Sequence, residues 1–157
     1  MKQTKKGIVL LCLMALTIGF TASCSKMDVG YLRTEGASFT PDSLNVFHNI
    51  DPTSVQATDN LPFVSIRIQG VAGTNPVNYE LSSVKADSPS ASELFMKLYK
   101  EGKISVAGGL IVVSQDASRQ LTNGHYVLSL KVYNEDHEAI LKDVFKIVVT
   151  DDELPTA

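Results

Sequence analysis

The sequence contains no tryptophan and only two cysteines among 157 residues, and aromatic residues make up 7% of it. Cys12 lies within an uncharged apolar segment, residues 8–20, and Cys24 follows that segment. If the N-terminal segment is removed, Cys24 alone is left, and one cysteine cannot form an internal disulfide. We therefore expect packing, rather than covalent cross-links, to hold the fold together.

The sequence also lacks an excess of basic residues. It has 14 Lys and Arg against 17 Asp and Glu, a formal net charge of −3. Domains that bind nucleic acid need a basic surface to neutralise phosphates, so the composition excludes that class of partner. Residues 1–23 hold three lysines and no acidic residue, so their removal leaves 11 basic and 17 acidic residues and a net charge of −6.

Motifs for catalysis and for metal binding are missing as well. His48, His125 and His137 are isolated and show none of the short spacings that gather a metal ion. There is no nucleophile elbow and no glycine-rich phosphate loop. The acidic clusters at 135–138 and 151–153 lack the regular spacing of calcium ligands, which favours a solvated turn and an acidic tail. We expect no enzyme, no cofactor and no metal.

What the sequence does contain begins with a secretory signal. Lys2, Lys5 and Lys6 precede the apolar segment 8–20, and small residues follow it at 21–23. This is the three-part layout of a signal peptide. The apolar segment is shorter than the roughly 20 residues of a membrane-spanning helix, so a retained span is the weaker interpretation. Residues 1–23 are predicted to be a signal peptide.

The four residues Thr21-Ala22-Ser23-Cys24 resemble the lipobox of bacterial lipoproteins, in which small residues precede a cysteine that is acylated and becomes residue one. The resemblance implies a lipoprotein anchored in the bacterial outer membrane through acyl chains such as palmitate on Cys24. Each buried methylene contributes about 0.8 kcal/mol, so two or three chains hold the protein firmly. The alternative is an ordinary signal peptide that leaves a lone thiol, which is unusual in an oxidising compartment.

Residues 24–40 are interpreted as the lipidated cysteine and a tether, because this segment has two glycines, scattered charges and no sustained periodicity. The stretch GYLRTEGASFTPDSLNVF, residues 30–47, is similar to the start of small surface lipoproteins of Bacteroidetes-type bacteria. That similarity implies display at the cell surface.

From residue 41 to residue 151 the pattern is mainly β. Short alternating apolar runs bounded by Gly, Pro, Asn and Asp predict strands at 43–47, 61–69, 77–82, 103–107, 110–114, 125–134 and 139–150. Seven strands at regular spacing are typical of a β-sandwich. Residues 152–157 are expected to form an acidic tail.

One short helix is predicted between these strands. Ser90-Ala91-Ser92-Glu93 matches a capping box, and Leu94, Phe95, Leu98 and Tyr99 follow at helical spacing. Gly102 provides the stop. A helix this short needs a core to pack on, which favours a crossover helix at the edge of the sandwich over a docking helix.

Alternation also predicts which side chains form the core. In 61–69 we expect Val64, Ile66 and Ile68 to share one face, opposite Ser65, Arg67 and Gln69. In 125–134 we expect Tyr126, Leu128, Leu130 and Val132 to point inward, and Val127, Ser129, Lys131 and Tyr133 to point outward.

The segment Asn123-Gly124-His125-Tyr126-Val127-Leu128 is similar to the tyrosine corner of immunoglobulin-like domains, and the C-terminal third looks like the end of a PKD-type or cadherin-like module. The resemblance implies that the Tyr126 hydroxyl bonds backbone just upstream. The fold class expected is therefore all-β, a single immunoglobulin-like β-sandwich of about seven strands with one short helix.

The expected function is that of a lipid-anchored, non-enzymatic binding or accessory module at the outer membrane, with glycan or nutrient capture as its role. An envelope protein is the other partner considered, and the domain is expected to be monomeric. The loops 70–76 and 134–138 are the candidate contact loops. Tyr133 is the candidate aromatic for stacking on a sugar; the alternative is a tyrosine on an edge strand that covers the sheet.

A structural or assembly subunit, of adhesin or fimbrial type, is the second function considered. Such subunits exchange strands between neighbours. The final strand, 142–150, is long and apolar enough to be donated, although its expected pairing with 125–134 argues against donation.

Overall fold

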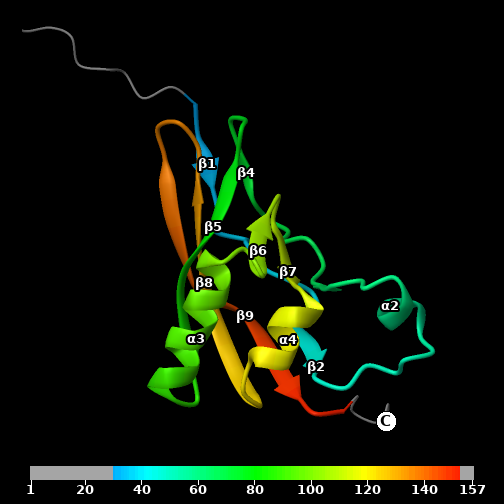
Figure 1. Ribbon diagram of the computed structural model, residues 1–157. Coiled ribbons are helices and arrows are strands. Elements are labelled where there is room, and N and C mark those ends of the chain that lie inside the picture. Colours follow the sequence, from blue (N-terminus) through cyan, green and yellow to red (C-terminus); the bar gives the residue numbers. More distant parts are fainter. Residues whose placement is uncertain (1–29, 153–157) are drawn as a thin grey trace, which may run out of the picture.

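The computed structural model describes residues 30–152 of the chain. The predicted signal peptide, Cys24 and residues 153–157 lie outside the described residues. The described part is mostly β, and its strands form three sheets (Figure 1).

The largest sheet has four strands in the order β2-β9-β8-β5. They are β2 (Ser43–Phe47), β5 (Asn78–Ala86), β8 (Gly124–Tyr133) and β9 (Glu138–Thr150). Strand β2 runs parallel to β9, while β9, β8 and β5 are antiparallel to one another. A two-stranded sheet of β1 (Leu32–Arg33) and β4 (Ala72–Gly73) extends one end of the molecule.

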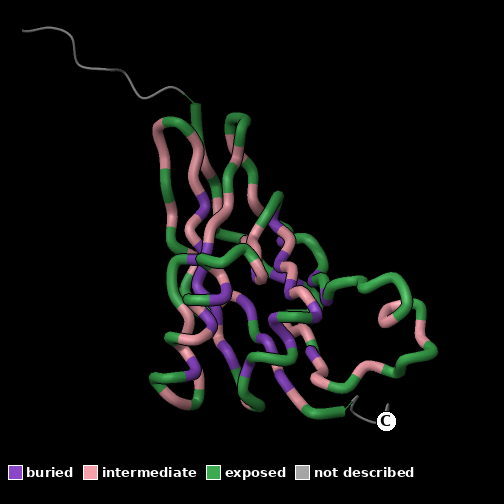
Figure 2. The backbone as a smooth tube through the Cα atoms, viewed as in Figure 1, coloured by how far each residue is buried: buried purple, intermediate pink, exposed green. Residues whose placement is uncertain are grey.

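A second layer covers the large sheet. It contains the antiparallel sheet β3-β7-β6, made of β3 (Phe63–Val64), β6 (Ile104–Ala107) and β7 (Leu110–Val113), together with helix α3 (Pro89–Lys100). Helix α4 (Gln115–Gln120) connects β7 to β8, and helix α2 (Val55–Thr58) lies in the connection from β2 to β3. Residues of both layers contribute to one buried core cluster, and Figure 2 marks the buried residues along the chain in purple.

The predicted inner face of 125–134 is confirmed. Tyr126, Leu128, Leu130 and Val132 are each at most 1% exposed. Phe95 of α3 is fully buried, and its ring lies 5.2 Å from the ring of Tyr126. Packing of α3 on this face of β8 is therefore a central part of the core.

The Tyr126 hydroxyl makes the contact that was expected of it. It donates to the backbone oxygen of Thr122 at 2.8 Å, and the Thr122 hydroxyl lies 2.9 Å away. The tyrosine thus ties the end of α4 to the start of β8 while its ring fills the core.

The predicted face of 61–69 is wrong. Only Phe63–Val64 forms a strand, and Phe63 and Ser65 point inward, while Val64 is 45% and Ile66 37% exposed. The Ser65 hydroxyl donates to Ile66 O at 2.7 Å and accepts from Ile111 N at 2.9 Å. These bonds satisfy the buried hydroxyl, so a serine takes an inward position that alternation assigned to the outside.

The prediction of one helix starting at Ser90 is also corrected. Ser88, not Ser90, is the N-cap of α3; its hydroxyl accepts from Ala91 N, and Pro89 occupies the first turn. The two short helices α2 and α4 were not predicted. Ser54 and Ser114 cap them in the same way, but four and six residues are too few to show a helical period.

The tether predicted at 24–40 is corrected in its described part. Strand β1 pairs with β4, Ser38 pairs with Gln69, and Phe39 is 4% exposed with its ring 4.5 Å from that of Phe145. A side chain at Gly70, whose φ is +72°, would overlap the backbone of Gly36. The folded domain therefore starts before residue 41, because segment 31–40 packs on it.

Helix α3 also covers the outer edge of the large sheet. The Tyr99 hydroxyl accepts from Leu81 N at 3.1 Å, and the Ser92 hydroxyl accepts from Ala86 N at 3.0 Å. Two backbone donors on the outer side of β5 are satisfied in this way.

A bulge in β9 explains why Ser129, predicted to point outward, is only 4% exposed. Asp143 in this bulge has a φ of +52°, a conformation that Asp and Asn tolerate. Asp143 N donates to the Ser129 hydroxyl at 3.0 Å, and Lys85 Nζ lies 2.6 Å from Asp143 Oδ2. The hydrogen bond from Lys85 lowers the pKa of the Asp143 carboxyl.

We predict that Asp143→Asn lowers the free energy of unfolding near neutral pH and loses this effect in acid. A carboxyl whose pKa is lowered by folding stabilises the protein above its unfolded pKa of about 3.9, and that contribution disappears as the pH falls through the lower folded value. Asn keeps the left-handed backbone, so the substitution isolates the charge. Urea unfolding at about pH 7 and about pH 2 would measure the difference. Asp59→Asn at the end of α2 is the control, and an effect equal at both pH values would contradict the prediction.

Candidate functional site

The long connection from β2 to β3, residues 48–62, leaves the body of the domain and returns to it through α2 (Figure 1). Connections of more than about 12 residues are uncommon in compact domains and are often functional. We call residues 48–62 the β2–β3 loop.

The start of the β2–β3 loop is fastened to the end of β9. The His48 ring lies 3.0 Å from Asp151 Oδ1 through Nδ1 and 2.9 Å from Leu121 O through Nε2. A carbonyl oxygen can only accept, so Nε2 is a donor. Asn49 Nδ2 donates to Asp152 Oδ1 at 2.8 Å. A hydrogen bond from the Asn123 side chain, followed by the contact with His48, lowers the pKa of the Asp151 carboxyl.

The far part of the β2–β3 loop is held by one buried amide. Gln115, at the start of α4, is 3% exposed. Its Nε2 donates to Gln56 O at 2.6 Å and to Leu61 O at 3.2 Å, and its Oε1 accepts from Arg119 at 3.2 Å. These bonds fix both ends of α2 relative to the core.

A pocket of about 360 Å³ opens between this loop and the end of β9. Its lining residues come from both segments: Phe47, Asn49, Ile50, Asp51, Pro52, Ser54, Gln56 and Asp152. The volume is within the range of small-molecule sites, about 300–1,000 Å³. We call this cavity the loop pocket.

The polar groups of the loop pocket are mainly acceptors, and no basic residue lines it. The Asp51 carboxylate accepts from the backbone N–H of Thr53 at 2.8 Å and from its hydroxyl at 2.7 Å. The backbone hydrogen bond, followed by the hydroxyl, lowers the pKa of Asp51, so its carboxylate is charged at neutral pH. Together with Phe47, Ile50 and Pro52, the lining suits a ligand with hydroxyl donors and an apolar face.

The structure places Tyr133 away from this pocket. Tyr133 ends β8, which lies between β9 and β5, so it is not on an edge strand. It pairs with Glu138 and Asn78, is half-buried, and has Lys131 Nζ 5.3 Å from the centre of its ring. Lys131 already makes a cation–π contact with the ring that was proposed for a sugar.

The two candidate loops, 70–76 and 134–138, meet each other and the start of the described chain. Asn134 Nδ2 donates to Tyr31 O at 3.0 Å and to Thr74 O at 3.3 Å. Tyr31 N donates to the Thr74 hydroxyl at 3.1 Å, and His137 Nε2 lies 3.2 Å from Gly30 O. Several hydrogen-bonding groups of these loops therefore already have partners within the protein.

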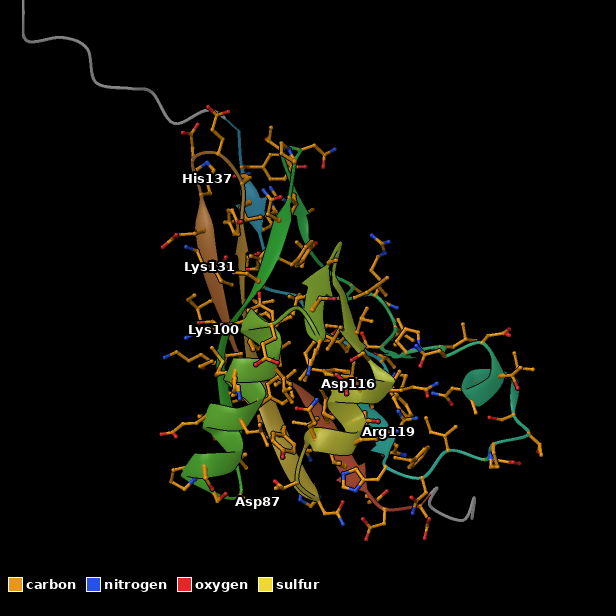
Figure 3. The ribbon with its side chains drawn as sticks, viewed as in Figure 1. Asp87, Lys100, Asp116, Arg119, Lys131 and His137 are labelled. Carbon is orange, nitrogen blue, oxygen red and sulfur yellow. The ribbon has the colours of Figure 1, made fainter. Side chains whose placement is uncertain are left out.

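These loops lie at the opposite end of the molecule from the base of α3. His137 marks one end and Asp87, which precedes α3, marks the other (Figure 3). Within residues 30–152, no group of three or more His, Cys, Asp and Glu side chains could hold a metal ion. In the same part of the chain, no helix has the length and apolar character needed to cross a membrane.

Comparison with protein-family models, with curated proteins and with solved structures finds no match for this chain.

The sequence did not identify the loop pocket. Asp51, Asn49 and Asp152 belong to no motif, and they meet only because β2 and β9 end side by side. The one signal available was the length of the polar connection between the first two predicted strands.

We predict that Gln115→Ala costs about 2 kcal/mol of unfolding free energy, because it removes the side-chain donor to Gln56 O and Leu61 O and leaves a small cavity. Gln56 O keeps its hydrogen bond from Leu61 N. The β2–β3 loop should also become the first site of limited proteolysis. Gln120→Ala, on the exposed side of the same helix, is the control and should change stability little. Urea unfolding and proteolysis would test both variants, and equal effects would contradict the prediction.

Proposed function

We propose that this chain is a lipid-anchored envelope protein that binds its ligand without catalysis, through a single immunoglobulin-like β-sandwich. Supporting this fold, β5, β8 and β9 form one sheet, as strands C, F and G do in such domains, and β3, β7 and β6 form the other, as B, E and D do. The contact from the Tyr126 hydroxyl to Thr122 O matches the tyrosine corner.

The anchor is the acyl group proposed on Cys24, which places the protein in the bacterial outer membrane at the cell surface. The described chain begins at Gly30, beside the turn that joins β8 to β9. The loop pocket lies at the other end of β9, because Phe47 pairs with Thr150 and Asp152 follows it. Strand β9 has 13 residues. Its bulge takes up two of these residues without adding length, so at roughly 3.3 Å per residue the two ends are about 33 Å apart.

The loop pocket is the observation that carries the proposed function. It is a concave site that combines acceptors with apolar side chains, and it lies at the end of β9 opposite the start of the described chain at Gly30. Sugar hydroxyls can donate to Asp51 and Asp152, while the C–H face of a sugar ring can pack on Phe47 and Ile50. Small glycans from nutrient polysaccharides are therefore the proposed ligands, bound at the loop pocket instead of at Tyr133.

The test is calorimetric titration of the mature chain with neutral mono- and oligosaccharides. Gln56→Ala and Asp152→Ala should each weaken binding about tenfold, the effect of losing about 1.4 kcal/mol. Asp59→Ala, which lies in the same loop but outside the lining, is the matched control and should bind normally. Absence of saccharide binding, or equal affinity in all variants, would overturn the proposed ligand class.

No specific observation favours an assembly subunit. Strand β9 is paired on both sides within its own chain, by β2 and by β8, so it is not free for donation to a neighbour.

A further inference from the structure

One end of the domain, formed by residues 30–33, 72–74 and 134–137, is fixed where the described chain begins. Strands β1 and β4 pair there, and Asn134 and His137 bind the backbone of residues 30–31. We call this the N-terminal end (Figure 1). Because these hydrogen bonds hold Gly30 on the body of the domain, the fold fixes the point at which the described chain begins.

Few residues separate this end from Cys24. The chain advances at most about 3.3–3.6 Å per residue when fully extended. The six steps from Cys24 to Gly30 therefore span about 20 Å at most. This reach is shorter than the distance estimated along β9, so an anchored domain cannot turn its far end to the membrane as easily as its N-terminal end.

We propose that the N-terminal end is a membrane-facing surface that rests on the lipid headgroups and directs the loop pocket away from them. This inference depends on the proposed acylation of Cys24. Tyr31 is 52% exposed at this end, and Arg33 lies 5.9 Å from the centre of its ring. A tyrosine with an apolar ring and a polar hydroxyl suits the headgroup layer.

The charges at the N-terminal end and in the strands next to it are mixed. Lys131 lies 2.7 Å from Glu138 and 3.8 Å from Glu80, and Glu135 and Asp136 add negative charge to the turn. No basic cluster among the described residues of the N-terminal end therefore selects anionic lipid. The anchor, not electrostatic attraction, supplies the affinity, so a zwitterionic bilayer is the appropriate partner.

The absence of tryptophan makes the test direct, because a single introduced indole is the only one in the protein. The acylated mature protein, which begins at Cys24, would carry Tyr31→Trp in one variant and Val55→Trp, at a 67% exposed position in α2, in the other. Each would be placed on phosphatidylcholine vesicles that contain lipids brominated near the headgroup. We expect bromine to quench the Tyr31→Trp fluorescence at least twofold more than that of Val55→Trp.

Equal quenching at the two positions, or stronger quenching at Val55→Trp, would overturn the orientation while leaving the anchor intact. The Tyr31→Trp protein with Cys24→Ser is the control, and it should neither co-sediment with vesicles nor be quenched. If the protein with Cys24 intact does not co-sediment with vesicles, both the proposed lipid anchor and the proposed orientation are overturned.

Discussion

A mature chain that lacks residues 142–157 is expected to be unfolded. The deletion removes Phe145, Ile147 and Val149, none of which is more than 2% exposed, and it leaves β2 without the strand that pairs with it within residues 30–152. The loss includes most of the central strand β9, so no rearrangement of the remaining strands can rebuild the four-stranded sheet. Far-ultraviolet circular dichroism and gel filtration would show the loss of β structure and of the compact size.

The control is a shorter deletion of residues 153–157, which should leave the domain folded. A truncated chain that stays soluble, folded and monomeric, and that takes up a peptide of residues 142–150, would contradict this prediction. It would support instead an assembly subunit that accepts a donated strand.

A large loss of unfolding free energy is expected from Phe95→Ala. Phe95 is fully buried between α3 and the large sheet, and its ring lies 5.2 Å from that of Tyr126. Truncating a buried Phe to Ala typically costs about 3–5 kcal/mol, because it removes the buried ring and leaves a cavity. The total stability of a domain is about 5–15 kcal/mol, so this single change removes a large share of it.

Met96→Ala is the matched control for Phe95→Ala. Met96 is the next residue of the same helix and is half-buried beside the core, so its truncation should cost about 1 kcal/mol or less. Equilibrium unfolding in urea would compare the two variants. If Met96→Ala were as destabilising as Phe95→Ala, α3 would not pack on the sheet through the face described here.

The parts of the fold predicted correctly from the sequence are those with strong periodicity. The four inward residues of β8 alternate without interruption, and the Tyr126 contact follows from a local motif. The prediction failed in 61–69. Alternation there suggested a shared face of Val64, Ile66 and Ile68. In the structure the buried residues of this segment are Phe63, Ser65 and Ile68. An alternating sequence does not show which of the two faces of a strand points inward. Long-range hydrogen bonds, such as the one from Ile111 N to the Ser65 hydroxyl, decide which face does.

The candidate site was less predictable than the fold. The loops 70–76 and 134–138 were candidates because loops at the ends of a sandwich make its contacts, yet their side chains bind residues 30–31. The loop pocket forms where β2 and β9 end beside each other, and that parallel pairing joins segments about 100 residues apart in the chain. Single-sequence periodicity carries no information about such a pairing.

The hydrogen bonds from Leu81 N and Ala86 N to the side chains of Tyr99 and Ser92 have a consequence if the chain is lipid-anchored as we propose. An open strand edge recruits strands from other molecules and starts aggregation. Anchored proteins share a plane, where neighbouring copies collide often. Side chains of α3 accept hydrogen bonds from two backbone N–H groups on the outer edge of β5. A strand from a neighbouring copy therefore cannot pair with these two groups. The crossover helix therefore also protects the domain against edge-to-edge association.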